Sequence, residues 1–135
     1  MSRRRLVDTN LIVRYLVQDH EKHAQAAGKL FDACDRGEIV IVVLPTVLAE
    51  CVFVLESFYE HPRGNISSAL GRLISSPGVE IGGTTIQLDA LNRYGKTKVH
   101  FVDCLIAATA AAENMPVASF DQDLRKFTDV RIETE

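Results

Sequence analysis

The stretch Ile39-Val40-Ile41-Val42-Val43-Leu44, followed directly by Pro45, decides the fold of this chain. Six β-branched or aliphatic residues in a row are typical of a strand that is buried on both faces. Proline is favoured at the first position of a helix, so Pro45 predicts a helix that continues from Thr46 to Tyr59. The stretch therefore predicts a buried strand that leads at once into a helix.

The same alternation extends in both directions along the chain. We expect further strands over residues 4–8, 79–81, 116–120 and 130–132, and helices from Leu11, over 20–35, 65–75, 86–94 and 102–113, with a turn or short helix over 121–127. Strands alternating with helices of this length indicate a parallel sheet with helices on both faces. The predicted fold class is α/β.

Length and composition agree with one domain that spans residues 1–135. The chain is 47% hydrophobic and 24% charged, an ordinary globular composition, with a formal net charge of −3. Its longest uncharged stretch, residues 39–49, is too short to cross a bilayer, and no export signal is recognisable. Three cysteines without a CxxC pair argue against a disulfide framework or zinc knuckle. We expect a cytoplasmic protein without membrane contact.

Four acidic residues interrupt apolar segments: Asp8, Glu50, Asp103 and Asp121. Helical spacing places Glu50 among apolar neighbours, which predicts that its side chain lies along an apolar face. Burying a carboxylate without a partner costs several kcal/mol. This cost is a large part of the free energy of unfolding of a typical domain. Simpler readings exist for each residue, since Asp8, Asp103 and Asp121 stand where helix caps occur, and Glu50 could pair with a basic residue.

One shared cause explains all four acids better than four separate ones. Asp8 and Asp121 stand at the carboxyl ends of predicted strands, and Glu50 and Asp103 are expected within about two turns of the start of helices that follow a strand. The carboxyl ends of parallel strands meet at one edge of a sheet, where ligands bind. Clustered carboxylates without His or Cys suit Mg²⁺ or Mn²⁺. The sequence thus predicts metal-assisted phosphodiester hydrolysis.

Four motifs in order resemble the PIN-domain family, and within it the VapC-type toxins of toxin–antitoxin pairs. They are Val7-Asp8-Thr9-Asn10, Leu48-Ala49-Glu50, the run from Phe101 to Ala108 around Asp103, and Ser119-Phe120-Asp121-Gln122-Asp123-Leu124. The resemblance implies a three-layer α/β/α sandwich with a central, mainly parallel sheet and Mg²⁺- or Mn²⁺-dependent endoribonuclease activity. It also implies that Asp8, Glu50, Asp103 and Asp121 are the catalytic and metal-binding acids.

The resemblance extends to the surroundings of the acids. Thr9 matches a hydroxyl that supports the first acid, and Asn10 either does the same or caps its helix. Ser119 keeps the hydroxyl of the fourth motif. Asp123 is either a further acid of the site or a solvated turn residue. His100 stands where many relatives have an acid. Family members are held inactive by a cognate antitoxin, and they commonly form homodimers or toxin–antitoxin hetero-oligomers.

Other readings stay open at this point. Setting the four acids aside leaves the rest of the chain slightly positive, so nine basic residues could contact RNA phosphates: Arg3, Arg4, Arg5, Arg14, Arg93, Lys96, Lys98, Arg125 and Lys126. The alternatives are a catalytically silent PIN module that binds RNA or a protein, a nuclease that acts on DNA, and a purely structural α/β protein whose acids are paired with bases.

Overall fold

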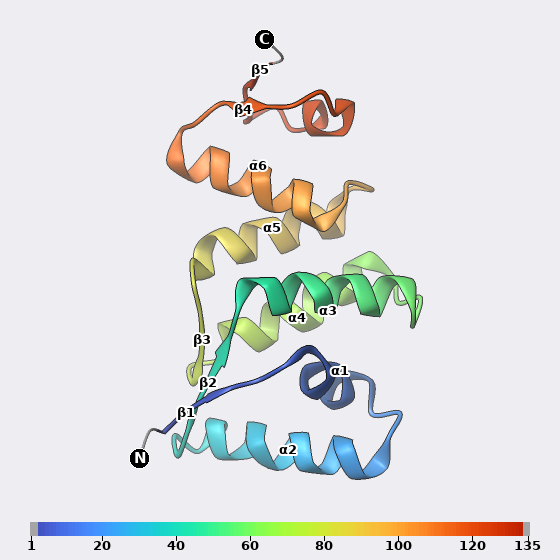
Figure 1. Cartoon of the computed structure of the whole chain (residues 1–135), viewed down its shortest axis with the longest axis vertical. Helices are drawn as coiled ribbons and strands as arrows, with labels where there is room; N and C mark the ends of the chain where they lie inside the picture. The colour runs from blue at the N-terminus through green and yellow to red at the C-terminus, as the bar shows by residue number, and fades with distance from the viewer. Residues whose placement is uncertain (1–2, 134–135) are drawn as a thin grey trace.

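Helices and strands follow one another in the predicted order (Figure 1). In this computed structural model, which describes residues 3–133, the strands are β1 (Arg4–Leu6), β2 (Val40–Val43), β3 (Val79–Ile81), β4 (Val117–Ala118) and β5 (Ile132–Glu133). The helices are α1 (Thr9–Val17), α2 (Glu21–Asp35), α3 (Pro45–Ser57), α4 (Arg63–Ser75), α5 (Thr84–Lys96), α6 (Phe101–Glu113) and the short 3₁₀ helix η1 (Gln122–Lys126). Each predicted element is confirmed, with ends that differ by a few residues.

The first three strands form a parallel sheet in the order β1-β2-β3. Leu6 is the register partner of Val42, and Ile41 is the partner of Val79. Helices flank this sheet, which confirms the predicted α/β class. Pro45 begins α3 as expected, because its missing N–H is one that the first helical turn leaves without a partner in any case.

The decisive strand β2 differs in one respect from the expectation. Ile41 and Val43 are buried, but Val40 and Val42 on the opposite face are only half-buried. Leu6 shares that second face and is 70% exposed. The apolar run therefore predicted the strand correctly but not its burial on both faces, because part of the second face has no helix over it.

The last two strands stand apart from this sheet. β4 and β5 pair with each other in parallel as a separate two-stranded sheet, where the sequence predicted one central sheet. In Figure 1 this pair lies at the top of the long axis, the β1-β2-β3 sheet lies in the lower half beside α3 and α4, and α5 and α6 lie between the two sheets. The helix that precedes β4, α6, packs on α5.

A polar network fixes this helical stack. Arg63 at the start of α4 donates to the carbonyl oxygens of Tyr94 and Val99, and it pairs with Glu56 of α3 at 3.2 Å. The buried Tyr94 hydroxyl donates to the same Glu56 carboxylate. Because these contacts join α3, α4, α5 and the residues just before α6, they position the N-terminus of α6.

Candidate functional site

The first acidic pair lies where β1 leads into α1 and on α3. Asp8 is the N-cap of α1, and its carboxylate accepts a hydrogen bond of 2.9 Å from the Leu11 N–H. The helix therefore begins at Thr9, so Asn10 is not the cap that the sequence also allowed. An N-cap and a metal ligand are compatible roles, because the hydrogen bond uses only one of the lone pairs on the two carboxylate oxygens.

The negative charges of Glu50 and Asp8 both act on the buried thiol of Cys51. Burial raises the pKa of Cys51 to about 12, with further contributions from the charges of Glu50 and then Asp8. Glu50 itself is exposed, so the expectation that it lies along an apolar face is wrong. Its neighbours Cys51 and Val52 are buried instead, which turns Glu50 to the outer side of α3.

The second acidic pair lies between α6 and η1. Asp103 sits half-buried in the first turn of α6, and Asp121 is the exposed N-cap of η1. Burial raises the pKa of Asp103 most, and the charge of Asp121 and a hydrogen bond between the two side chains raise it further. The charge of His100 acts in the opposite direction, and that of Asp123 adds to the increase. The surroundings of Asp103 thus disfavour its ionised form.

The neighbouring polar residues support this second pair. The hydroxyl of Ser119 accepts from the Asp121 N–H at 2.9 Å, and the Asp121 carboxylate accepts from the Asp123 N–H at 2.9 Å. Asp123 also forms an ion pair with Lys126 at 3.4 Å. Ser119 therefore orients the backbone of Asp121. At the first pair, Thr9 is half-buried at the start of α1 and Asn10 is exposed.

The structure does not bring the two pairs together within one chain. The charges of Asp121, His100 and Asp123 act on Asp103, whereas those of Asp8 and Glu50 act on Cys51. Among residues 3–133, no group of three or more His, Cys, Asp or Glu side chains is placed to hold one ion. The prediction that all four acids converge on one edge required a single sheet, and the separation of β4 from β1 removes that edge.

The chemistry of the two pairs fits a hard divalent cation even though their arrangement in one chain is incomplete. All four side chains are carboxylates, the ligands that suit Mg²⁺ or Mn²⁺. The neighbouring cysteines Cys51 and Cys104 are buried core residues whose thiol pKa values are raised to about 12 and about 11 by burial. They therefore stay protonated and do not compete for a metal.

Several basic residues that the sequence offered for RNA phosphates have other partners. Arg14 pairs with Asp19 at 2.7 Å, and Arg93 pairs with Asp89 and Asp129. Lys96, Lys98 and Arg125 are exposed. Sequence reasoning also missed the network of Glu56, Arg63 and Tyr94, because nothing in the local pattern connects residues so far apart in the chain.

The comparisons with known proteins agree with this architecture. The family model described as PIN domain matches residues 5–130, nearly the whole chain. A comparison with curated proteins gave no match. Within the described part of the chain, no helix has the length and apolar character needed to cross a bilayer. PIN domains are a family of metal-dependent nucleases that typically use a divalent ion. Since the match covers far more than half of the sequence, the chain belongs to the PIN domain family.

Proposed function

We propose that this protein is a Mg²⁺- or Mn²⁺-dependent endoribonuclease and the toxin of a toxin–antitoxin pair. The observation that supports this most is the contact between the carboxyl groups of Asp103 and Asp121, which together with burial raises the pKa of Asp103. Two adjacent acids are unfavourable without a cation between them, and family membership supplies the expected one. Asp8 and Glu50 complete the proposed set of ligands.

The proposed roles follow from the position of each side chain. Asp8, Glu50, Asp103 and Asp121 hold the divalent ion, and Ser119 fixes Asp121 through its N–H. A divalent ion held there supplies an activated water and offsets the negative charge that develops on phosphorus. Thr9 and Asn10 lie at the start of α1, and their proposed role is to orient that side of the site. Asp123 supports Asp121 from within η1.

RNA is the proposed substrate because exposed lysines precede Asp103 in the chain. Lys96 and Lys98 are exposed in and just after the last turn of α5, shortly before Asp103 in the chain. Lysines in that position can contact phosphates on either side of the cleaved bond, which adds sequence-independent affinity. Few aromatic residues are available to stack on bases, so the chain offers no account of base preference.

A protein partner is proposed from the surface of α3. Phe53 is 67% exposed on this helix, and Phe58, just beyond its end, is 76% exposed. Exposed aromatic side chains on one helix are typical of a protein interface. An antitoxin segment in the cytoplasm is the proposed occupant, and it would control access to Glu50 on the same helix.

Cleavage of labelled single-stranded RNA tests the proposed activity. The wild type should cleave RNA with Mg²⁺ or Mn²⁺ and stop when a chelator is added, and DNA of the same sequence should stay intact. Asp8→Asn and Asp103→Asn should each lower the rate at least about 100-fold. Asp32→Asn, an exposed acid on α2, is the matched control and should cleave like the wild type. Wild-type cleavage by either active-site variant would contradict the proposal.

A second candidate function is a silent PIN module that binds RNA or a protein without cleaving it. The separation of the two acidic pairs within one chain favours this reading. It predicts RNA binding that is the same with and without a divalent ion. A filter-binding titration of RNA in Mn²⁺ and in chelator, run beside the cleavage assay, distinguishes the two functions.

A further inference from the structure

One arginine side chain holds the connection between α5 and α6. Arg63, the first residue of α4, donates from Nε to the Tyr94 carbonyl oxygen at 3.1 Å and from Nη2 to the Val99 carbonyl oxygen. Tyr94 lies in the last turn of α5, and the buried Val99 lies one residue before His100, the N-cap of α6. Arg63 therefore binds the backbone at both ends of this connection.

Arg63 is itself held from α3 and α5. Its Nη1 donates to both carboxylate oxygens of Glu56 at 3.2 Å, and the Tyr94 hydroxyl donates to one of these oxygens. The guanidinium carbon lies 3.8 Å from the centre of the Tyr94 ring. Every nitrogen of the guanidinium group thus has a partner, and its rigid plane meets all of them in one orientation. The side chain is 21% exposed, so water screens these contacts weakly.

The first turn of α6 depends on the position of the Val99 carbonyl. The side chain of the N-cap residue His100 makes no capping hydrogen bond within the described residues. The Cys104 thiol donates to the same Val99 carbonyl at 3.6 Å, and Phe101 packs edge-on against Tyr94. A helix end without a side-chain cap frays easily, so the fixed carbonyl decides where α6 begins.

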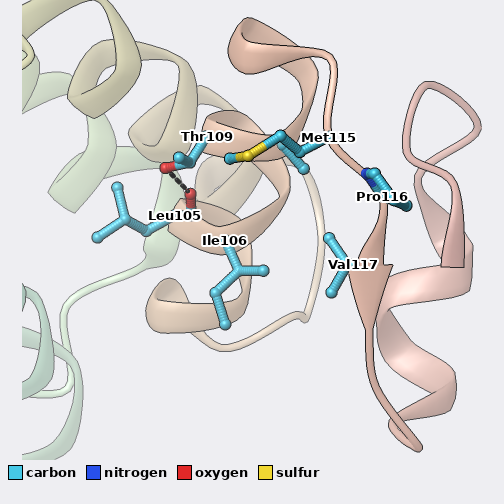
Figure 2. Close-up of a pocket in the computed structure, with 7 residues that line it drawn as sticks. Leu105, Ile106, Thr109, Met115, Pro116 and Val117 are labelled. Atoms are coloured by element: carbon cyan, nitrogen blue, oxygen red, sulfur yellow. Dashed lines mark hydrogen bonds between the residues drawn. The ribbon is translucent and has the colours of Figure 1, made fainter. Parts of the chain in front are cut away.

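The side of α6 that faces β4 gives the helix little support. An apolar hollow of about 430 Å³ lies between the helix and residues 115–117, and Leu105, Ile106 and Val117 line it (Figure 2). Val102 in the first turn is 58% exposed. The first turn is therefore held from the side of α4 and α5, where Arg63 lies.

We infer that Arg63 is a positioning residue of the acidic site: by binding the Val99 carbonyl it holds the first turn of α6, and Asp103 with it, in one place. Glu56 fixes Arg63 from α3, the helix that carries Glu50. The effect on RNA cleavage rests on the proposed function, whereas the fixed position of the first turn does not. A displacement of about 1 Å in an active site can lower the rate about 100-fold.

The thiol of Cys104 reports whether the first turn of α6 opens. It is buried, and burial raises its pKa to about 11, with Thr97 and then Arg63 acting in the opposite direction. In folded Arg63→Gln, N-ethylmaleimide should label Cys104 at least about 10-fold faster than in the wild type, as read by mass spectrometry of peptides. Loss of the Arg63 charge alone would raise the pKa of the thiol and slow the reaction, so faster labelling reports opening.

The two other cysteines separate local opening from a general loss of stability. Cys34 of α2 and Cys51 of α3 are buried as well, and their labelling rates should stay at the wild-type level in Arg63→Gln. If all three thiols react faster by the same factor, Arg63 contributes to global stability alone and the inference is overturned. It is also overturned if Cys104 reacts at the wild-type rate.

Glu56→Gln tests the same contacts by a milder change, and it is the decisive variant if Arg63→Gln does not fold. It should label the thiol on α6 faster than the wild type. Asp19→Asn is the matched control, because Asp19 also accepts hydrogen bonds from an arginine and a tyrosine, Arg14 and Tyr59, each at 2.7 Å. These contacts join α1 to the segment after α3, so the control should label like the wild type. Equal effects of the two substitutions would contradict the inference.

The kinetics of RNA cleavage test the effect on the site. Arg63→Gln should lower kcat at least about 10-fold and change KM less than about 2-fold, because the exposed lysines that contact RNA are unaltered. Arg63→Lys keeps the charge without the fork of donors and should give an intermediate kcat. A wild-type kcat in a variant whose Cys104 is labelled faster would contradict the positioning role. A wild type that leaves RNA intact would instead contradict the proposed function, and the labelling rates would still decide whether Arg63 fixes the first turn.

Discussion

Asp103 in the first turn of α6 shares a side-chain hydrogen bond with Asp121 at the start of η1, and the charge of Asp121 makes ionisation of Asp103 less favourable. Burial raises the pKa of Asp103, and the charge of Asp121 adds to the increase. A raised carboxyl pKa means that the folded protein binds this proton more tightly than the unfolded chain does. The ionised form therefore lowers stability at neutral pH, and the penalty falls as the pH approaches the pKa.

Asp103→Asn should stabilise the metal-free protein at neutral pH. Removing one of two adjacent charges relieves the repulsion, and the gain should be less than about 1 kcal/mol because the carboxyl is partly solvated. Thermal unfolding in chelator measures it, with Asp32→Asn as the control. In excess Mn²⁺ the wild type should be more stable than Asp103→Asn, because it gains stability from the bound ion. A variant that is less stable than the wild type in chelator would show that the pair is not strained.

Substitutions of Asp8 should separate its role as a cap from its role in the site. Asp8→Ala removes the acceptor for the Leu11 N–H and should cost about 1 kcal/mol, whereas Asp8→Asn keeps a good N-cap and should leave stability nearly unchanged. Both variants should lose RNA cleavage. Denaturant unfolding and the cleavage assay measure the two effects. Equal stability of the two variants would contradict the role of Asp8 as a helix cap. An active Asp8→Asn variant would contradict its role in catalysis.

The helical stack that holds α6 can be tested at two glycines. A Cβ at Gly95 of α5 would lie 2.8 Å from the Cβ of Ser67 on α4, whereas one at Gly71 would meet only Leu88 at 4.0 Å. Gly95→Ala should therefore destabilise the protein by about 1–3 kcal/mol. Gly71→Ala should stabilise it by about 0.5–1 kcal/mol, as expected inside a helix. The two substitutions should therefore change the free energy of unfolding in opposite directions, and chemical denaturation measures both changes. If both substitutions stabilise the protein, α4 and α5 are not in close contact.

The ion pair of Arg93 with Asp129 should give a pH-dependent contribution to stability. Arg93 binds both carboxylate oxygens, and these hydrogen bonds lower the pKa of Asp129. An acid whose pKa is lowered by folding stabilises the fold at pH values above its unfolded pKa of about 3.9. This stabilisation is lost as the pH falls through the pKa of the folded state. Asp129→Asn should lower stability near pH 7 by less than about 1 kcal/mol, because solvent screens the exposed carboxylate.

Melting curves of Asp129→Asn and the wild type near pH 7 and near pH 2 check this contribution. The two curves should differ near neutrality and converge in acid. A difference that persists unchanged at the lower pH would show that the carboxylate charge contributes nothing and that only side-chain packing was altered.

The sequence predicted the elements of this fold more completely than their assembly. The run from Ile39 to Leu44 with Pro45 gave β2 and α3, because periodicity and capping are local properties. The exposure of Leu6 and the separate β4–β5 sheet could not be predicted in this way. They depend on whether α6 stays on α5, which is decided by Arg63, Glu56 and Tyr94 acting across distant parts of the chain.

The candidate site shows the same limit. Asp8, Glu50, Asp103 and Asp121 stand out in the sequence as acids among apolar residues, and their type and order predict metal-assisted hydrolysis, which stays a prediction. The sequence could not show that they form two pairs, since that depends on which strands are neighbours in space. The cap formed by Asp8 and the exposure of Glu50 show that position next to apolar residues does not establish burial.

Titration of Mn²⁺ into the protein, followed by calorimetry, tests most directly whether the two pairs of acids hold one metal ion. Asp8→Asn and Asp103→Asn should each lower the affinity at least about 10-fold, because each removes a ligand of the same ion, while Asp32→Asn should bind like the wild type. If Asp8→Asn binds Mn²⁺ as tightly as the wild type and only Asp103→Asn does not, the two pairs are separate and the account is wrong.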